Sequence, residues 1–206
     1  IRSRLEALAN PFETGITEDQ LALSLVTTLR AEARSEDFAV GGEIHDARVI
    51  VQEGDAFADE IDALELGQLY FAWRPRDLML TGDRLDVSAG RLTIDVGSRR
   101  LIARAVYRNI YNMFSGLDAR WTTRGGFEAR AIHVSPHKRL PDDASSALDN
   151  EVVANPVLDN VKLSVLSLTA PVGRDATLEG YLYDLDEDDS DDAQSQSADA
   201  RRAVVP

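Results

Sequence analysis

Hydrophobic and polar residues alternate along most of this chain with a period of two. Between residues 38 and 46, Phe38, Val40 and Ile44 fall on one face of an extended segment, while Glu43 and His45 fall on the other. A helix, with its period of 3.6, would mix the two sets. The pattern therefore predicts β-strands that each have one apolar and one polar face.

Reading the whole chain in this way predicts nine strands. They are residues 1–9, 19–33, 38–46, 64–73, 84–96, 117–123, 127–134, 161–170 and 176–184. In 84–96 the apolar phase is odd from Leu85 and even from Leu92, so we expect either a β-bulge near Gly90 and Arg91 or two short strands. The strands predict an all-β fold with almost no helix.

The sixth segment shows the alternation clearly, and it predicts the orientation of each side chain. One face of this strand could meet lipid and the other water. We expect an outward-facing apolar set and an inward-facing polar set on the concave side of a curved sheet, namely Leu117, Ala119 and Trp121 against Asp118, Arg120 and Thr122.

The connections between the expected strands alternate in length. Short ones at 34–37, 73–84, 124–126 and 171–175 take turns with long ones at 10–18, 46–63, 97–116, 135–160 and from 184 onward. Up-and-down membrane barrels have tight turns on one side of the membrane and long loops on the other. A soluble sandwich has no reason to sort its loops in this way. Each strand is therefore expected to pair with its sequence neighbours.

Composition narrows the function further. No run of 18 apolar residues occurs, so a transmembrane helix is not expected. The formal charge of −14 argues against nucleic acid as a partner. The charge is uneven, because residues 84–130 carry nine arginines against four acids and have a local charge of +5. The chain has no cysteine, which excludes thiolate metal sites and cysteine nucleophiles.

Several stretches in the same order resemble the alginate export family of outer-membrane proteins. They are AGRLTIDVGSRRLIAR at 89–104, YRNI at 107–110, FSGL at 114–117, LDN at 148–150, GYLY at 180–183 and LDEDD at 185–189. The resemblance implies an antiparallel barrel with roughly twice the strands expected here, which passes an anionic uronate polysaccharide or a related solute. It also implies that the chain is the N-terminal half of a longer protein.

The fold expected is thus an antiparallel up-and-down transmembrane β-barrel, with about nine strands and incomplete. Residues 1–190 form the partial barrel, and 184–206 form an acidic extracellular loop and a truncated end. The expected location is the bacterial outer membrane. Its lipid and lipopolysaccharide are expected partners, with periplasmic export machinery as an open alternative.

An arginine cluster is the candidate binding site. Guanidinium groups stay charged at any working pH and pair with carboxylates in bidentate fashion, which suits an anion path. The alternative is that these charges are solvated, or form ion pairs with Asp95, Asp118 and Glu128 that stiffen the barrel. The candidate residues are Arg91, Arg99, Arg100, Arg104, Arg108 and Arg120, with Asn109 as a donor to sugar hydroxyls.

Two other functions remain open at this point. A soluble β-rich carbohydrate-binding module would bury the apolar faces, and a surface hydrolase built on a barrel would need His133, Ser135 and a nearby acid to converge. His137 completes only a superficial likeness to a catalytic set. The acidic run from Asp184 to Asp192 lacks the spacing of a calcium loop and is expected to be solvated. The leading hypothesis is a passive channel, with no catalytic residue, no metal and no cofactor.

Overall fold

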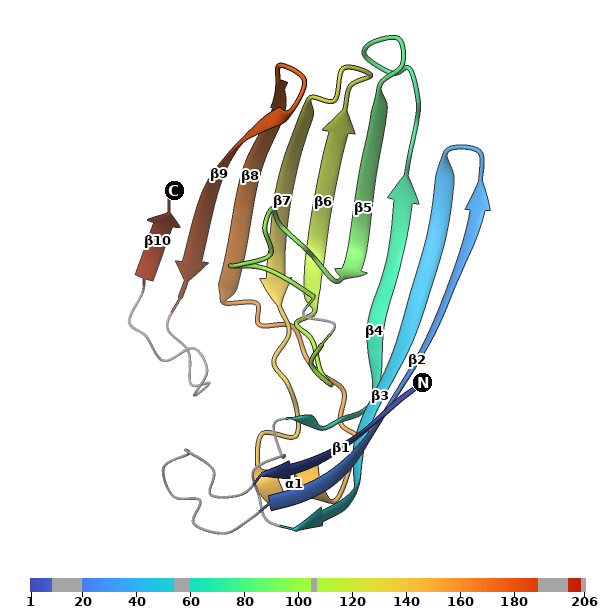
Figure 1. Cartoon of the computed structure of the whole chain (residues 1–206), viewed down its shortest axis with the longest axis vertical. Helices are drawn as coiled ribbons and strands as arrows, with labels where there is room; N and C mark the ends of the chain where they lie inside the picture. Colours follow the sequence, from blue (N-terminus) through green and yellow to red (C-terminus); the bar gives the residue numbers. More distant parts are fainter. Residues whose placement is uncertain (9–19, 54–59, 105–106, 189–199, 205–206) are drawn as a thin grey trace.

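A computed structural model describes residues 1–8, 20–53, 60–104, 107–188 and 200–204 (Figure 1). Ten strands and one short helix make up the fold. They are β1 (Arg2–Leu8), β2 (Gln20–Ser35), β3 (Phe38–Glu53), β4 (Asp62–Trp73), β5 (Arg84–Leu92), β6 (Phe114–Thr122), β7 (Glu128–Pro136), α1 (Ala144–Leu148), β8 (Val161–Val172), β9 (Ala176–Glu187) and β10 (Ala200–Val204).

The strands form a single antiparallel sheet in which every strand pairs with its sequence neighbours, in the order β1 to β10. This confirms the expected up-and-down topology, and each of the nine predicted strands is present. Among the described residues the sheet is open, with β1 and β10 at its edges, and it does not close into a barrel. No described helix is long and apolar enough to cross a membrane.

The expected end of the chain, a loop over 184–206, is wrong in part. Strand β9 continues to Glu187, and residues 200–204 add a tenth strand that pairs with it, Val204 opposite Tyr183. The acidic run therefore begins inside a strand, where Asp184 and Asp186 pair across the ladder with Ser164 and Lys162. Residues 189–199 lie outside the described part.

The connections alternate in length from β5 onward, as predicted, and the short and long ones lie at opposite ends of the sheet. The expected long connection at 46–63 is wrong, because β3 continues to Glu53 and leaves only residues 54–61, fewer than the 74–83 connection that was expected to be short. Strands β2 and β3, β4 and β5, β6 and β7, and β8 and β9 are joined at the upper end of Figure 1, which we call the turn end. The long connections 93–113 and 137–160 leave from the lower end, which we call the loop end.

The two faces of the sheet differ sharply in chemistry. On β3, Val40 is 53% exposed whereas Glu43 is 2% exposed, as the alternation predicted. Directly paired residues share a face, so the cross-strand register traces one apolar surface from β2 to β9. This surface, the exposed face, comprises Leu29, Ala31, Ala33, Phe38, Val40, Gly42, Ile44, Leu66, Leu69, Phe71, Trp73, Leu85, Val87, Ala89, Leu117, Ala119, Trp121, Ala129, Ala131, Leu166, Leu168, Ala170, Leu178 and Leu182.

The opposite face, called here the covered face, lies under the two long connections. In the connection 93–113, Ile94, Val96 and Ile102 pack on residues of this face such as Val165 and Tyr183. The prediction for β6 is met in its arrangement, because Leu117, Ala119 and Trp121 belong to the exposed face and Asp118, Arg120 and Thr122 to the covered one.

The second long connection folds onto the same face at the loop end. Leu148 of α1 packs on Ala22, Val49 and Ile61. Asn150 then makes two hydrogen bonds with the backbone of Val49, accepting from the amide at 3.1 Å and donating to the carbonyl at 3.0 Å. A strand edge is thereby satisfied by a side chain, which pins this connection to β3.

The expected bulge near Gly90 is not found, and neither are two short strands. Strand β5 pairs with β4 and β6 without a shift of register, Gly90 lying between Tyr70 and Gly116. Gly90 instead has a φ of +128°, and a Cβ there would collide with the Leu69 carbonyl. The apolar phase changes because Leu85, Val87 and Ala89 lie on the exposed face, whereas Leu92, at the end of the strand, and Ile94 and Val96 after it belong to the buried core on the covered face.

Candidate functional site

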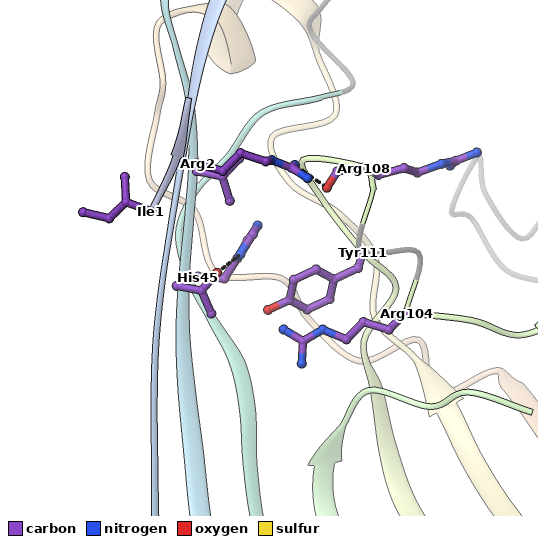
Figure 2. A pocket seen from close by; sticks show the side chains of 8 residues that line it. Ile1, Arg2, His45, Arg104, Arg108 and Tyr111 are labelled. Atoms are coloured by element: carbon purple, nitrogen blue, oxygen red, sulfur yellow. Dashed lines mark hydrogen bonds between the residues drawn. The ribbon is translucent and has the colours of Figure 1, made fainter. Parts of the chain in front are cut away.

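A pocket of about 300 Å³ lies between the first three strands and the connection 93–113 (Figure 2). Strands β1 to β3 contribute one wall, and residues before β6 contribute the other. The lining residues are Ile1, Arg2, Val26, Thr28, His45, Arg104, Arg108 and Tyr111. Three of the eight are arginines, which makes this pocket the candidate functional site.

Arg104 reaches across the pocket to the covered face of β3. Its guanidinium lies 2.5 Å from Glu43 Oε1 and 4.3 Å from the centre of the Tyr111 ring. Its backbone N–H donates to Asp95 Oδ1 at 2.8 Å. Arg104 is therefore held in an ion pair, a hydrogen bond and a cation–π contact, and its charge is largely balanced by Glu43.

Glu43 accepts hydrogen bonds from several residues beside the pocket. The Tyr111 hydroxyl donates to Oε1, and the Gln68 amide donates to Oε2 at 3.1 Å. Burial raises the pKa of Tyr111, and its hydrogen bond to Glu43 raises it further, so the phenol stays protonated and remains a donor. Tyr111 was not among the residues singled out from the sequence.

His45 ties the pocket wall to the connection above it. Its Nε2 lies 2.8 Å from the Asn109 carbonyl oxygen, which can only accept, so this nitrogen carries the ring proton. Its Nδ1 then accepts from the Thr28 hydroxyl at 3.3 Å. The imidazole is thus fully occupied by neighbours, and it serves to position the backbone of the connection.

Asn109, a predicted sugar contact, is buried and occupied. Its side-chain oxygen accepts from Arg2 at 2.8 Å, and its amide nitrogen donates to Glu60 at 2.8 Å. Arg2 also donates to the Arg108 carbonyl at 2.7 Å. The first strand is therefore tied to the connection through Arg2, a pocket residue that sequence reasoning missed because nothing in the pattern brings residue 2 near residue 108.

Only two of the predicted arginines, Arg104 and Arg108, line the pocket. Arg108 is exposed, and in Figure 2 its side chain extends away from Tyr111 and His45. Arg91 lies elsewhere, 2.9 Å from the buried Glu65 and 3.1 Å from Met113 Sδ.

The three remaining arginines lie apart from the pocket. Arg99 is 3.4 Å from Asp95, Arg120 is 3.6 Å from Glu128, and Arg100 is exposed. The predicted cluster is therefore spread over the covered face and its loop. Within the described residues, four of its six arginines, Arg91, Arg99, Arg104 and Arg120, face a carboxylate at 3.6 Å or less.

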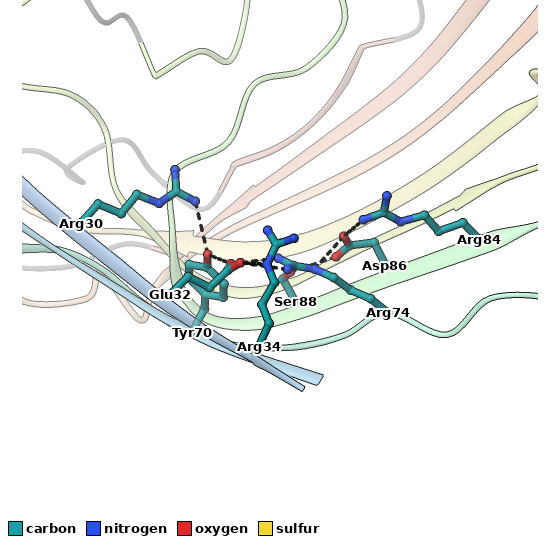
Figure 3. A network of polar contacts seen from close by, with 8 residues as sticks. All are labelled: Arg30, Glu32, Arg34, Tyr70, Arg74, Arg84, Asp86 and Ser88. Atoms are coloured by element: carbon teal, nitrogen blue, oxygen red, sulfur yellow. Dashed lines mark hydrogen bonds and ion pairs between the residues drawn. The ribbon is translucent and has the colours of Figure 1, made fainter. Parts of the chain in front are cut away.

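A second charged network lies on the covered face near the turn end (Figure 3). Glu32 accepts from the Tyr70 hydroxyl and from both terminal nitrogens of Arg74 at 3.2 Å, and Arg74 Nε lies 3.0 Å from Asp86. Charges of alternating sign thus bridge β2 to β5 across the sheet. The network comprises Arg30, Glu32, Arg34, Tyr70, Arg74, Arg84 and Asp86.

The residues expected for a hydrolase do not converge. His133 lies on the exposed face beside Ser164 at 3.0 Å, and Ser135 accepts from Lys162 at 2.8 Å. His137 lies 2.8 Å from the Ser115 hydroxyl and, through Nδ1, 2.8 Å from the Asn155 carbonyl. Burial lowers the pKa of His137, so it is neutral at pH 7 and anchors the connection 137–160.

Asn155 links this anchor to a pair of buried acids. Its backbone N–H donates to Glu65 at 2.8 Å, and its amide donates to both oxygens of Asp62 at 3.2 Å. Among the described residues no group of histidines and acids has the arrangement of a metal site. The polar residues of the covered face thus take part in charge pairing and hydrogen bonding.

No family model matches the chain, and no curated protein or solved structure matches it. The resemblance to the alginate export family therefore stays a prediction.

Proposed function

We propose that this chain forms part of the wall of a bacterial outer-membrane channel that conducts an anionic solute by passive diffusion. One observation carries the proposal: the face with the large apolar surface is exposed, and the face that carries the charged networks beside its own core is covered. A soluble protein would bury the apolar face. A membrane barrel presents it to lipid and keeps its charges in the water-filled interior.

The extent of the exposed face supports a lipid environment. A soluble protein rarely exposes a contiguous apolar patch larger than a few hundred Å². This face carries twelve large apolar side chains that are each more than a third exposed, spread over β2, β3, β4, β6, β8 and β9. They are Leu29, Phe38, Val40, Ile44, Leu66, Leu69, Phe71, Leu117, Leu166, Leu168, Leu178 and Leu182.

The length of the apolar runs and the position of the tryptophans also fit an outer-membrane barrel. At about 3.3 Å per residue, the apolar run from Phe38 to Ile44 rises about 20 Å and the run from Leu21 to Ala33 about 40 Å. These values bracket the apolar band of about 25 Å in outer-membrane barrels. Trp73 and Trp121 lie on the exposed face at the turn end, where such barrels carry an aromatic girdle.

The covered face supports a path for anions. Arg2, Arg104 and Arg108 line the pocket, and the two long connections fold over the sheet as loops that narrow a channel do. The solute class is an anionic polysaccharide such as a uronate polymer, as the resemblance implies. Lipopolysaccharide and periplasmic export proteins are the partners that this location would supply.

Closure of the barrel needs strands other than those described. Strands β1 and β10 each have one unpaired edge. Exposed edges invite aggregation, and a closed barrel removes them. In the proposed channel both edges pair with further strands.

Alternating cysteines along β6 test the membrane part of the proposal. Since the chain has no cysteine, single variants from Leu117→Cys to Thr122→Cys can each be labelled. In vesicles, labels at 117, 119 and 121 should be quenched by lipid-borne quenchers and resist a water-soluble thiol reagent, while those at 118, 120 and 122 should react. Reactive odd positions would overturn the lipid-facing assignment. Odd positions that resist the reagent without being quenched from lipid would indicate the soluble binding module, which buries its apolar face.

Ion selectivity tests the solute class. In planar bilayers under a salt gradient, the closed channel that contains this chain should show an anion-selective reversal potential. The variant Arg104→Gln with Arg108→Gln should lower that preference without loss of the folded sheet, and raising the salt should weaken the effect as charges are screened over about 8–10 Å. An unchanged potential would exclude these two residues, and cation preference in the parent chain would exclude an anionic solute.

A further inference from the structure

The connection between β4 and β5, residues 74–83, exposes three consecutive large apolar side chains. Leu78, Met79 and Leu80 are 49%, 58% and 55% exposed. Burying a side chain of this size is worth about 1.5–3 kcal/mol, so exposing three together is unfavourable in water. Single exposed apolar residues are common, but a contiguous set at the tip of a turn marks a contact surface.

The turn that presents these side chains is rigid. The carboxylate of Asp83 accepts hydrogen bonds from the backbone N–H groups of Leu78, Met79 and Leu80 at 2.9, 3.0 and 3.0 Å. Asp77 accepts from the Gly82 N–H at 2.5 Å, and Asp77 and Gly82 both have positive φ, as a tight turn requires. The apolar tip is therefore held in place by a buried carboxylate.

Asp83 also fixes where the tip lies. The Trp121 indole donates to Asp83 Oδ2 at 2.8 Å, and Trp121 belongs to the exposed face. This bond, followed by those from the three amides, lowers the pKa of Asp83, so the carboxylate stays charged and the turn stays closed at neutral pH. The tip is thus continuous with the exposed face and lies beyond its tryptophan margin.

Arginines lie at the base of the turn. Arg124 packs against Gly82, its Cβ and Cδ 3.1 Å from the position that a Cβ of residue 82 would occupy. Arg76 and Arg84 form an isolated bridge at the base of the turn. In Figure 1 this turn extends beyond its neighbours at the turn end. An apolar tip with arginines at its base matches the boundary between acyl chains and anionic headgroups.

We propose that the β4–β5 turn is a membrane-interface anchor that inserts Leu78, Met79 and Leu80 at the level of the lipid headgroups. The inference rests on the proposed function, because it takes the exposed face to be the surface that meets lipid. An anchor at this turn would place the turn end of the sheet at the level of the headgroups, and it would thereby fix the position of the channel along the membrane normal.

A label on the turn tests the anchor. The variant Met79→Cys, carrying a polarity-sensitive fluorophore, is incorporated in full-length form into phosphatidylethanolamine and phosphatidylglycerol vesicles. Its emission should shift to the blue, and quenchers attached near the headgroup should act on it more strongly than quenchers deep in the acyl chain. A matched label at Ala119→Cys, midway along the exposed face, should show the opposite order of quenching.

The two labels separate the two proposals. A Met79 label in water with an Ala119 label in the acyl region would overturn the anchor and leave the channel wall intact. Both labels in water would overturn both proposals. Protection of the Met79 label in vesicle-free solution, in step with dimer formation, would assign the tip to a contact between copies of the chain and overturn the anchor.

Rigidity of the turn is tested with the same fluorophore. Adding Asp83→Ala removes the acceptor of four hydrogen bonds, so the Met79 label should become more mobile and its headgroup quenching should fall at least twofold. Asp142→Ala, an exposed acid paired with Lys138 at 2.9 Å on another connection, is the matched control and should leave the label unchanged. Equal effects of the two variants would contradict a preorganised tip.

Discussion

Replacing Arg104 by glutamine should destabilise the protein by about 2–3 kcal/mol, and the reason lies in Glu43. Removing one partner of a fully buried ion pair costs about 3–5 kcal/mol, because a buried charge is left uncompensated. Glu43 is 2% exposed, but Tyr111 and Gln68 would still donate to it, and Arg104 itself is partly exposed. Each remaining charged hydrogen bond is worth about 1.5–3 kcal/mol, so the expected cost falls below the upper limit.

A double-mutant cycle isolates this pair. Glu43→Gln removes the buried charge, so adding Arg104→Gln to it should cost about 1 kcal/mol or less. The coupling between positions 43 and 104 is then about 2 kcal/mol. Arg100→Gln is the control, since Arg100 is exposed and surface changes of this kind fall within about 0.5 kcal/mol.

Urea unfolding of the lipid-reconstituted chain provides the measurement. The two tryptophans, Trp73 and Trp121, lie at the turn end and report loss of the sheet. Hydrogen exchange over residues 93–104 reports whether the connection has come loose. If Arg104→Gln unfolds at the same urea concentration as Arg100→Gln, the ion pair is an exposed contact and the reasoning fails.

Three further changes have defined outcomes. Ala119→Arg should cost about 2–4 kcal/mol in vesicles if the residue lies at mid-bilayer, whereas Ala119→Leu should be close to neutral, as measured by urea unfolding. The pKa of His137 is lowered, so the folded protein keeps it neutral. Its contribution to stability is full above about pH 6.5 and is lost as the pH drops below that value, where the unfolded chain takes up a proton. Exchange rates across residues 138–160 should then rise less on acidification in a His137→Asn variant than in the parent chain. Gly90→Ala should cost about 1–3 kcal/mol, because φ is +128° and the new methyl meets the Leu69 carbonyl, whereas Gly180→Ala meets nothing within 4 Å and should be tolerated in the same assay.

The alternation of apolar and polar residues predicted the strands because successive side chains of a strand point to opposite faces, and the two faces of this sheet differ in chemistry. Where a strand lacks this contrast between its two faces, the sequence pattern does not predict its bounds. Strand β3 continues past the expected end at residue 46, where it pairs with β2. The extension was missed because Asp46 and Arg48 interrupt the apolar face; they form an ion pair with each other at 2.8 Å. Strand β10, at 200–204, carries two adjacent arginines and no alternation, so nothing marked it in advance.

The pocket could not be predicted, because its contacts depend on the path of a long connection. Arg104 and Glu43 are 61 residues apart, and Arg2 and Asn109 are 107 apart. The alternation within a strand determines on which face of the sheet a side chain lies. It does not determine which residue from a distant part of the chain contacts that side chain. The acids expected to pair with the arginines were Asp95, Asp118 and Glu128. Arg99 and Arg120 do pair with two of them, while Arg91 and Arg104 pair with acids of β4 and β3.

This pairing changes how the basic centre of the sequence should be understood. The local charge of +5 over residues 84–130 is a property of the segment, and in the fold much of it is met by acids from outside the segment, such as Glu43 and Glu65. A field that attracts anions must then come from cations with no acid close by. Arg108 at the pocket and Arg100 on the loop have no ion pair within the described residues at 4.0 Å or less, whereas Arg104 is mainly an anchor. Different arginines of the cluster thus have the structural and the electrostatic role. Single substitutions should separate the two roles: a change at Arg104 should lower stability, and a change at Arg108 should lower anion preference.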